Sequence, residues 1–352
     1  SIAHVPMTGA LRVGPESAGA APGPACYGHG GDQPTVTDAN LLLGRLPARL
    51  LDGKMSLDVK AAEDAVGKIA RALGLDLHQA AQGILDIVNE NMFGALRLVS
   101  VQKGLDPRDF ALVAFGGAGP LHGNAMAMLG NCYPVIVPPT PGVLSALGFL
   151  YSDVKNEFAQ TYVRNVADAD GAQLAEIYAR LGREARGWLR EEGIDEGRQE
   201  LSYQADVRYF RQGYEFALKI NPESLSNGGL ADLEARFGAA HERLYGFRLE
   251  QPVELVNLRA VGAGQVEKVQ LPSFDLEAPD ASAAVYEQHR VYFDGGFLNA
   301  NIYDRKQLRA GHRLVGPAVV TQADSTTVIH PGHVGVVDRY LNILISLEGR
   351  QD

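Results

Sequence analysis

Three glycines within four residues, Gly116, Gly117 and Gly119, separate an apolar run from a segment with helical character. The apolar run covers residues 110–114, and residues 123–129 read as the start of a helix. Without Cβ atoms, the backbone of such a turn can approach a ligand closely, and the free N–H groups of a helix N-terminus attract anions. The spacing therefore predicts either a ligand-binding strand–turn–helix unit or the ordinary tight turn of an α/β domain.

Candidate acid–base residues lie on both sides of this turn. Asp38 follows a strand-like stretch, where it would orient water or a metal-bound phosphate, or cap a helix. Glu16 and Ser17 lie in a loop rich in Gly and Pro, residues 9–34, and are candidates for contacting a substrate or phosphate. His122 starts the helix after the turn, where the helix dipole disfavours imidazolium. His122 is therefore interpreted either as a polar lining residue or as a structural histidine.

The chain has only two cysteines, Cys26 and Cys132, so the sequence predicts no disulfide framework and favours a reducing cytoplasm. Cys26 lies in the Gly/Pro-rich loop. It would serve as a metal ligand together with Asp38 or His122, or as a buried structural thiol, which is the favoured interpretation. No neighbour in sequence would lower its pKa enough for a nucleophile.

The overall composition excludes several classes of function. A net charge of −10 without a basic cluster argues against nucleic-acid binding. The sequence contains no run of eighteen apolar residues, so it predicts no membrane-spanning helix. The first residues lack the pattern of a secretory signal. Because the chain starts at Ser1 rather than Met, the sequence is expected to be a processed or truncated piece of a longer protein.

The first half of the chain alternates between helices and strands, which predicts an α/β lobe. Thr37 or Asp38 is the expected N-cap of a short helix at 39–44. The further elements expected in this lobe are helices over residues 59–73 and 77–104, a strand at 109–115, a helix to 129, a strand at 135–137, a rigid turn at 138–142 and a helix from 143.

The pattern changes near residue 151, where extended and β-rich segments begin to dominate. We expect an extended linker over 151–164 and then a separate β-rich α+β domain over 165–352. Its expected elements are a charged helix at 172–192, a hairpin at 200–220, a helix at 230–245, a strand at 253–270 and short strands after 290.

The turn of the predicted hairpin carries several residues that are typical of protein interfaces. Two interpretations fit it: a subunit interface or a solvated hairpin tip. The residues concerned are Arg208, Tyr209, Gln212, Tyr214 and Glu215.

Several long motifs of this chain resemble the hydantoinase A/5-oxoprolinase family, which includes N-methylhydantoinase A and subunits of acetone and acetophenone carboxylases. The resemblance runs nearly end to end. In the first half it is carried by residues 9–20, 22–28, 34–40, 115–122 and 138–148. In the second half it is carried by 206–209, 212–215, His241, 245–246, 252–254, 257–259 and 316–320.

The resemblance implies an actin-like ATPase fold over residues 1–150, shared with sugar kinases and Hsp70 chaperones, followed by the smaller C-terminal domain. It implies ATP, with Mg²⁺ or Mn²⁺, as cofactors. The implied reaction phosphorylates a cyclic amide or carbonyl oxygen before the ring is opened by water. A ketone carboxylase subunit and a non-catalytic assembly subunit are the alternatives. A hydantoinase B-like subunit or domain and further oligomerisation are the implied partners.

By the same resemblance, Gly116, Gly117, Ala118 and Gly119 are the expected nucleotide-binding turn, and Asp38, Glu16 and His122 are the expected catalytic residues. No dedicated protein metal site is expected. The two phosphate-binding loops of actin-like ATPases precede the segment at which this chain begins. We therefore expect a missing N-terminal half, and no ATPase activity without that half and a partner.

Overall fold

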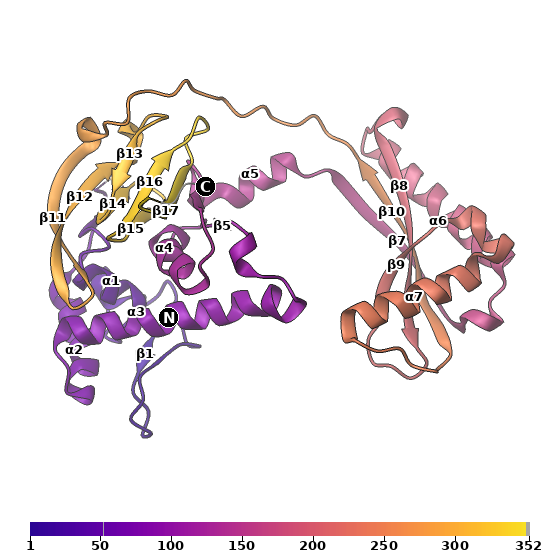
Figure 1. Cartoon of the computed structure of the whole chain (residues 1–352), viewed down its shortest axis with the longest axis horizontal. Helices are drawn as coiled ribbons and strands as arrows, with labels where there is room; N and C mark the ends of the chain where they lie inside the picture. Colours follow the sequence, from indigo (N-terminus) through magenta and orange to yellow (C-terminus); the bar gives the residue numbers. More distant parts are fainter. Residues whose placement is uncertain (52, 350–352) are drawn as a thin grey trace. The chain divides into compact units, whose positions relative to one another are not determined.

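The computed structural model describes residues 1–51 and 53–349, apart from the side chains of residues 226 and 227. The chain forms two compact units, which are considered separately below (Figure 1). The first unit combines residues 1–147 with residues 270–352, and the second covers residues 148–269. Both units combine helices with β-sheets, so the predicted mixed α/β class is confirmed.

Two larger sheets form the first unit, together with the short pairs β1–β2 (Ala3–His4 and Arg12–Val13) and β3–β4 (Arg49–Leu50 and Met55–Ser56). The first sheet has the order β13-β16-β17-β6-β5, with strands Arg313–Val315, His333–Val337, Ile343–Leu347, Val135–Val137 and Leu112–Val113. The second has the order β11-β12-β14-β15, with strands Val285–Phe293, Gly296–Asp304, Ala318–Thr321 and Thr326–Ile329. Neighbouring strands are antiparallel except the pairs β5–β6 and β12–β14.

Helices of the first unit pack against one another and against these sheets. Helices α1, α2 and α3 share one apolar core, and α4 packs on β15. These helices span Val36–Leu42, Val59–Leu73, Leu77–Val99 and Gly119–Gly130. Helix α5, at Leu144–Tyr151, has residues in both units.

Local capping signals explain where most of these helices begin and end. The α2 helix has the predicted bounds, because the Asp58 side chain caps it and Gly74 ends it in the left-handed conformation. The α3 helix stops at Val99, earlier than predicted. Ser100 leaves the helical conformation there, and a 3₁₀ turn continues to Lys103.

The Gly/Pro-rich loop is held by one buried carboxylate. Asp38 accepts hydrogen bonds from the backbone N–H of Cys26 at 2.8 Å, the backbone N–H of Thr35 at 2.9 Å and the Thr35 hydroxyl at 2.7 Å. The predicted N-cap at Thr37 or Asp38 is therefore wrong by a few residues. Thr35 is the N-cap of α1, and Asp38 completes the capping box.

A single antiparallel sheet of order β7-β10-β8-β9 forms the second unit, and α6 and α7 supply most of the other residues of its apolar core. The strands are Val154–Asn165, Val253–Gly264, Gln199–Tyr209 and Phe216–Ile220, and the helices are Gly171–Glu191 and Leu230–Tyr245. The predicted hairpin is confirmed by the pairing of β8 with β9. The extended conformation predicted at 151–164 is confirmed by β7, but the linker role is wrong for most of this segment, because β7 pairs with β10 along ten of its residues.

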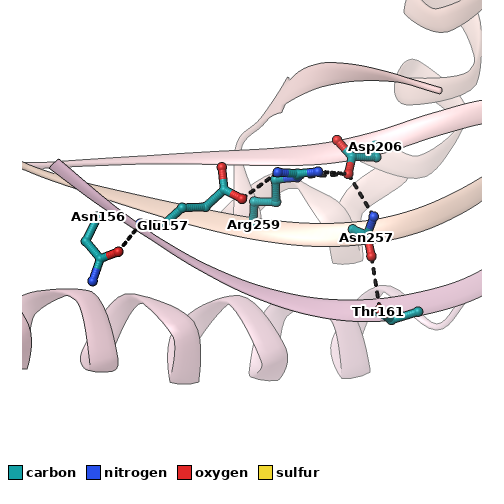
Figure 2. A network of polar contacts seen from close by, with 6 residues as sticks. All are labelled: Asn156, Glu157, Thr161, Asp206, Asn257 and Arg259. Atoms are coloured by element: carbon teal, nitrogen blue, oxygen red, sulfur yellow. Dashed lines mark hydrogen bonds and ion pairs between the residues drawn. The ribbon is translucent and has the colours of Figure 1, made fainter. Parts of the chain in front are cut away.

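A polar network on this sheet explains two of the sequence motifs (Figure 2). Arg259 on β10 forms ion pairs with Glu157 on β7 and with the buried Asp206 on β8. Asn257 donates to Asp206 at 2.9 Å and accepts from the Thr161 hydroxyl at 3.0 Å. The motifs at 206–209 and 257–259 therefore contain residues that join three neighbouring strands to one another.

The spatial division of the chain differs from the predicted one at residue 165. Strands β11–β17, which follow residue 270, belong to the first unit, because β17 pairs with β6 in the five-stranded sheet. The prediction grouped these strands with residues 165–269, and its last residues, 350–352, lie outside the described part. No helix within residues 1–51 and 53–349 is long and apolar enough to cross a membrane.

Replacing Asp38 with Ala should destabilise the first unit strongly. The change leaves the buried N–H groups of Cys26 and Thr35 without an acceptor, and such groups cost about 1–3 kcal/mol each. We expect Asp38→Ala to lower the free energy of unfolding by about 2–4 kcal/mol, measured by urea denaturation. The matched control is Asp58→Ala, an exposed helix cap worth about 1 kcal/mol. Equal losses in the two variants would contradict this role for Asp38.

Candidate ligand-binding cleft

A hollow of about 380 Å³ lies in the first unit beside the glycine turn. Four separate parts of the chain line it: the Gly/Pro-rich loop at Tyr27, α1 with the segment that follows it, the start of α4 with the turn before it, and the loop between β14 and β15 with the first residue of β15. This volume is near the lower end of the roughly 300–1,000 Å³ that is typical of small-molecule sites. The lining residues are Tyr27, Val36, Thr37, Asn40, Leu46, Leu50, Leu51, Gly117, Ala118, Leu121, His122, Gln322, Ala323, Asp324, Ser325 and Thr326.

The glycine turn connects β5 to α4, as the sequence predicts. Gly116 has a φ of 80°, which favours glycine, and its N–H donates to the Pro141 carbonyl at 2.7 Å. The Ser325 hydroxyl donates to the Gly117 carbonyl at 3.1 Å. Gly117 and Ala118 line the hollow, whereas Gly116 and Gly119 do not. Half of the predicted nucleotide-binding turn therefore faces the hollow.

His122 lies in the first turns of α4 and lines the hollow. Its side chain is buried, and Nδ1 lies 2.8 Å from Oδ1 of Asn89 on α3. Burial, with a smaller contribution from the Arg45 charge, lowers the pKa of His122 to about 4. His122 is therefore neutral at pH 7. Assigning the Nδ1 proton to the bond with Asn89 leaves Nε2 as a hydrogen-bond acceptor.

Asn89 is a residue whose function the sequence pattern only partly indicates. It interrupts the apolar stripe of α3, and the structure explains this polar position by its bond to His122. Arg45 lies close enough to act on the charge of His122. The Arg45 guanidinium donates to Gln82 at 2.7 Å and lies over the Phe293 ring at 4.7 Å. Burial of the imidazole and the nearby Arg45 charge together keep His122 uncharged.

Two amide side chains on the wall of the hollow have a buried oxygen without a hydrogen-bond partner. Asn40 is nearly fully buried, and its Nδ2 donates to the Val36 carbonyl at 3.0 Å, but Oδ1 has no partner. Gln322 donates through Nε2 to Asp324 at 2.7 Å, while Oε1 has no partner. Sequence reasoning missed both residues as lining groups, although Asn40 belongs to the 34–40 motif.

The hollow is therefore lined by residues that carry hydrogen-bond acceptors, Asp324 among them, and none of its lining residues is Lys or Arg. Its volume and its acceptor groups fit a neutral group with N–H and O–H donors, such as a nucleoside. Residues that would hold such a group are Asn40, Gln322, His122 and the backbone at Gly117 and Ala118. The same residues do not fit a triphosphate, since they supply no positive charge.

Two of the predicted catalytic residues lie outside this hollow. Asp38 is fully buried and uses both carboxylate oxygens to hold Cys26 and Thr35. Glu16 is exposed, and only its backbone carbonyl has a described contact, accepting from the Ile2 N–H at 2.9 Å. Of the three predicted catalytic residues, His122 alone lines the hollow.

Cys26 is fully buried, as the favoured interpretation expects of a structural thiol. Burial, followed by the charge of Asp38, raises the pKa of the Cys26 thiol. Within the described ranges 1–51 and 53–349, no group of three or more His, Cys, Asp or Glu residues is arranged to hold a metal ion.

Two further hollows adjoin the first and share residues with it. A hollow of about 400 Å³ shares Leu50, Leu51, Gln322 and Thr326 with the first. Another of about 330 Å³ shares Gln322, Ala323 and Asp324. The three hollows therefore adjoin one another along the loop between β14 and β15.

The hairpin tip lies in the second unit and is considered apart from this cleft. Arg208 is paired with Glu254 at 2.8 Å, and the Gln212 side chain contacts the buried His241. Tyr214 is about half exposed and lies against Tyr245 in a tilted arrangement, with ring centroids 5.5 Å apart. The interface predicted here stays a prediction.

The sequence matches two family models that together cover nearly the whole chain. Residues 1–158 match the model described as hydantoinase/oxoprolinase. Residues 162–347 match the model described as the hydantoinase/oxoprolinase C-terminal domain.

Similar proteins include enzyme subunits of known activity. An uncharacterized protein of Methanocaldococcus jannaschii is 40% identical, with 97% of this chain and 48% of that protein covered. Caprolactamase subunit alpha of Pseudomonas jessenii is 36% identical, with 94% and 49% covered. 5-Oxoprolinase 1 of Arabidopsis thaliana is 31% identical, with 97% and 28% covered. The chain spans about half the length, or less, of these curated relatives.

A solved structure supports the same relationship. The crystal structure of the ATP-dependent caprolactamase from Pseudomonas jessenii superposes with a TM-score of 0.85 at 33% identity, over 99% of this chain and 51% of that one. The nucleotide-free structure of acetone carboxylase has a TM-score of 0.78 at 22% identity, which shows a shared fold.

The buried neutral His122 should make the chain less stable in mild acid. Its pKa in the folded state, about 4, lies below the ordinary value of 6.5, so the unfolded chain binds the proton first as the pH falls from 6.5 to 4. This linkage should cost about 2 kcal/mol between pH 7 and pH 5. His122→Gln should remove that part of the loss, measured by urea denaturation at both pH values.

The exposed His29→Gln is the matched control, and its stability should follow that of the unaltered chain at both pH values. His330, whose pKa burial lowers to about 3, and His333, whose pKa burial also lowers, remain in every protein. Their contributions are therefore common to all three proteins, apart from the effect of His122 on His330, which is the smallest of the causes that lower the pKa of His330. An unchanged pH dependence in His122→Gln would show that His122 is not held neutral in the folded chain.

Proposed function

The chain belongs to the hydantoinase/oxoprolinase family, and we propose that it supplies one side of the active site of an ATP-dependent cyclic amide hydrolase. The observation that carries this proposal is the hollow beside the glycine turn, whose lining is rich in hydrogen-bond acceptors and contains no Lys or Arg. The names of two relatives, a caprolactamase subunit and a 5-oxoprolinase, favour a lactam as the substrate. ATP, when bound, supplies the phosphoryl group that activates the amide oxygen toward water.

Within this proposal, the residues of the cleft bind and orient the nucleoside portion. The backbone at Gly117 and Ala118 allows close approach, because these residues have small side chains or none. The oxygens of Asn40 and Gln322 accept N–H or O–H groups, and His122 Nε2 adds a third acceptor. Protonation of the imidazole would remove that acceptor, so the burial that keeps His122 neutral preserves the acceptor.

The other predicted residues have different roles in this proposal. Asp38 is a positioning residue, because it holds the first turn of α1, from which Thr37 and Asn40 line the hollow. Glu16 stays a prediction for substrate contact. Mg²⁺ or Mn²⁺ is proposed to enter with the phosphates, since the described residues offer no cluster for it.

The actin-like architecture of residues 1–150, the assignment of 165–352 to a C-terminal domain and the cytoplasmic location belong to the same proposal. Two free, buried cysteines are consistent with a reducing compartment. A hydantoinase B-like subunit and the other half of the relatives' polypeptide are the proposed partners. Relatives named as alpha, beta and gamma subunits support an assembly of several chains.

A ketone carboxylase subunit is the second candidate function. It is favoured by two relatives, the gamma subunit of acetophenone carboxylase at 31% identity and the beta subunit of acetone carboxylase at 27%. Both candidates use the same cleft, so the distinction depends on the substrate and on bicarbonate. A non-catalytic assembly subunit is the third candidate, and nucleoside binding in the cleft would argue against it.

Filling the hollow should weaken nucleoside binding without disturbing the fold. A Cβ atom on Gly117 would meet only the Asp324 carbonyl oxygen, at 3.6 Å, so a larger side chain can extend into the hollow. We expect Gly117→Leu to weaken adenosine binding about tenfold or more, measured by calorimetry. Gly94→Leu, on α3 with open space around it, is the matched control. Equal adenosine affinity in both variants would place the nucleoside elsewhere.

The whole reaction is tested by reconstitution. The chain is combined with the other half of the relatives' polypeptide and a hydantoinase B-like subunit, and ADP release is measured with a lactam, a hydantoin, 5-oxoproline or a ketone. ADP release with a cyclic amide and no need for bicarbonate supports the hydrolase. A requirement for bicarbonate with a ketone supports the carboxylase. No ADP release with any substrate would overturn both.

A further inference from the structure

The hollow of about 330 Å³ next to the nucleoside hollow has the opposite polarity. Three basic residues, Arg305, Lys306 and Arg309, line it, and Asp324 is its single acidic lining residue. This local excess of positive charge occurs in a chain whose net charge is −10. Composition therefore does not account for it, and the arrangement of these side chains is a local feature of the fold.

Arg305 is the buried member of this group. Only 8% of its surface is exposed, and its Nη2 donates to the Leu341 carbonyl. The buried Nη1 atom has no hydrogen-bond partner. Burial lowers the pKa of Arg305 to about 10, which leaves the guanidinium charged at pH 7. A charged donor without an acceptor in a buried place is costly unless a ligand satisfies it.

The carboxylates near Arg305 are already engaged by other groups. Asp324 accepts from the Gly142 N–H at 2.8 Å and from the Gln322 side chain at 2.7 Å. Asp338 accepts from the backbone N–H groups of Tyr340 and Asn342, both at 2.8 Å. Among the ion pairs of the described residues, none includes Arg305.

Arg309 extends the same wall at the surface. Its guanidinium donates only to backbone carbonyls, those of Lys306 at 3.0 Å and Leu308 at 3.1 Å, in the part of the chain that the structure describes. Leu308, Val337 and Leu341 form the apolar part of the lining. Apolar walls strengthen the attraction between a guanidinium and an anion by excluding water.

We propose that this hollow is a binding site for a small oxyanion, a phosphate or a carboxylate, held by Arg305 and Arg309. Guanidinium groups bind such oxygens through paired, charge-assisted hydrogen bonds. The oxyanion supplies the missing acceptor for Arg305 Nη1. The site is distinct from the nucleoside hollow, and the proposal does not depend on the function proposed above.

Binding is measured by calorimetric titration of inorganic phosphate or acetate into the whole chain, at constant ionic strength set with NaCl. We expect saturable binding of at least one of the two anions. Loss of one charge-assisted hydrogen-bond partner should raise the Kd about tenfold in Arg309→Gln. Arg305→Lys keeps the charge but loses the two-pronged geometry, and it should also weaken binding.

Arg313→Gln is the matched control, because Arg313 is exposed, lies in the same unit, pairs with Glu348 and is outside the hollow. We expect Arg313→Gln to change the Kd less than twofold, because an exposed charge contributes little interaction energy. Tighter binding of phosphate identifies a phosphoryl site, and tighter binding of acetate identifies a carboxylate site.

Three results would overturn the proposal. They are the absence of saturable binding of either anion, an unchanged Kd in Arg309→Gln, and equal weakening in Arg313→Gln. Arg309 is exposed and its guanidinium contacts only backbone, so this variant should fold even if Arg305→Lys does not.

Discussion

The buried carboxylate of Asp38 is the interaction on which the cleft depends. It receives donors from Cys26 in the Gly/Pro-rich loop and from Thr35 before α1, so one side chain determines where that helix starts. Helix α1 then carries Thr37 and Asn40 to the wall of the hollow. A buried charge without donors would be prohibitively costly, and these bonds offset that cost only in one geometry.

Burial also sets the chemical character of the first hollow. Packing of α3 against α4 brings Asn89 to His122 and keeps the imidazole neutral, with Arg45 nearby disfavouring a second positive charge. The neutral ring then adds an acceptor to those of Asn40 and Gln322. The hollow therefore favours donors on the ligand, and helix packing contributes to this preference alongside the Asp324 side chain, which also lines the hollow.

Local signals allowed much of the fold to be predicted from the sequence. The bounds of α2 follow from Asp58 and Gly74, and the hairpin of β8 and β9 follows from alternating apolar residues. The strand–turn–helix unit at the glycines was predicted for the same reason. Each of these elements is specified by residues that are close together in the chain, so propensity and capping suffice.

Features that depend on distant residues could not be predicted in this way. Strand β17 pairs with β6, so residues 343–345 lie beside residues 135–137, and no local pattern indicates this pairing. The same limit applies to the lining residues. Asn40 and Gln322 meet at one hollow although 282 positions separate them, and their unpartnered oxygens are visible only after folding.

The loop between β14 and β15 links the two hollows whose polarities differ. Gln322, Ala323 and Asp324 line both, and Asp324 is fixed by the Gly142 N–H, where a Cβ atom would lie 2.6 Å from the carboxylate. Glycine at 142 is therefore required for this wall to form. The same loop therefore borders the acceptors of Asn40 and His122 on one side and the guanidinium groups of Arg305 and Arg309 on the other.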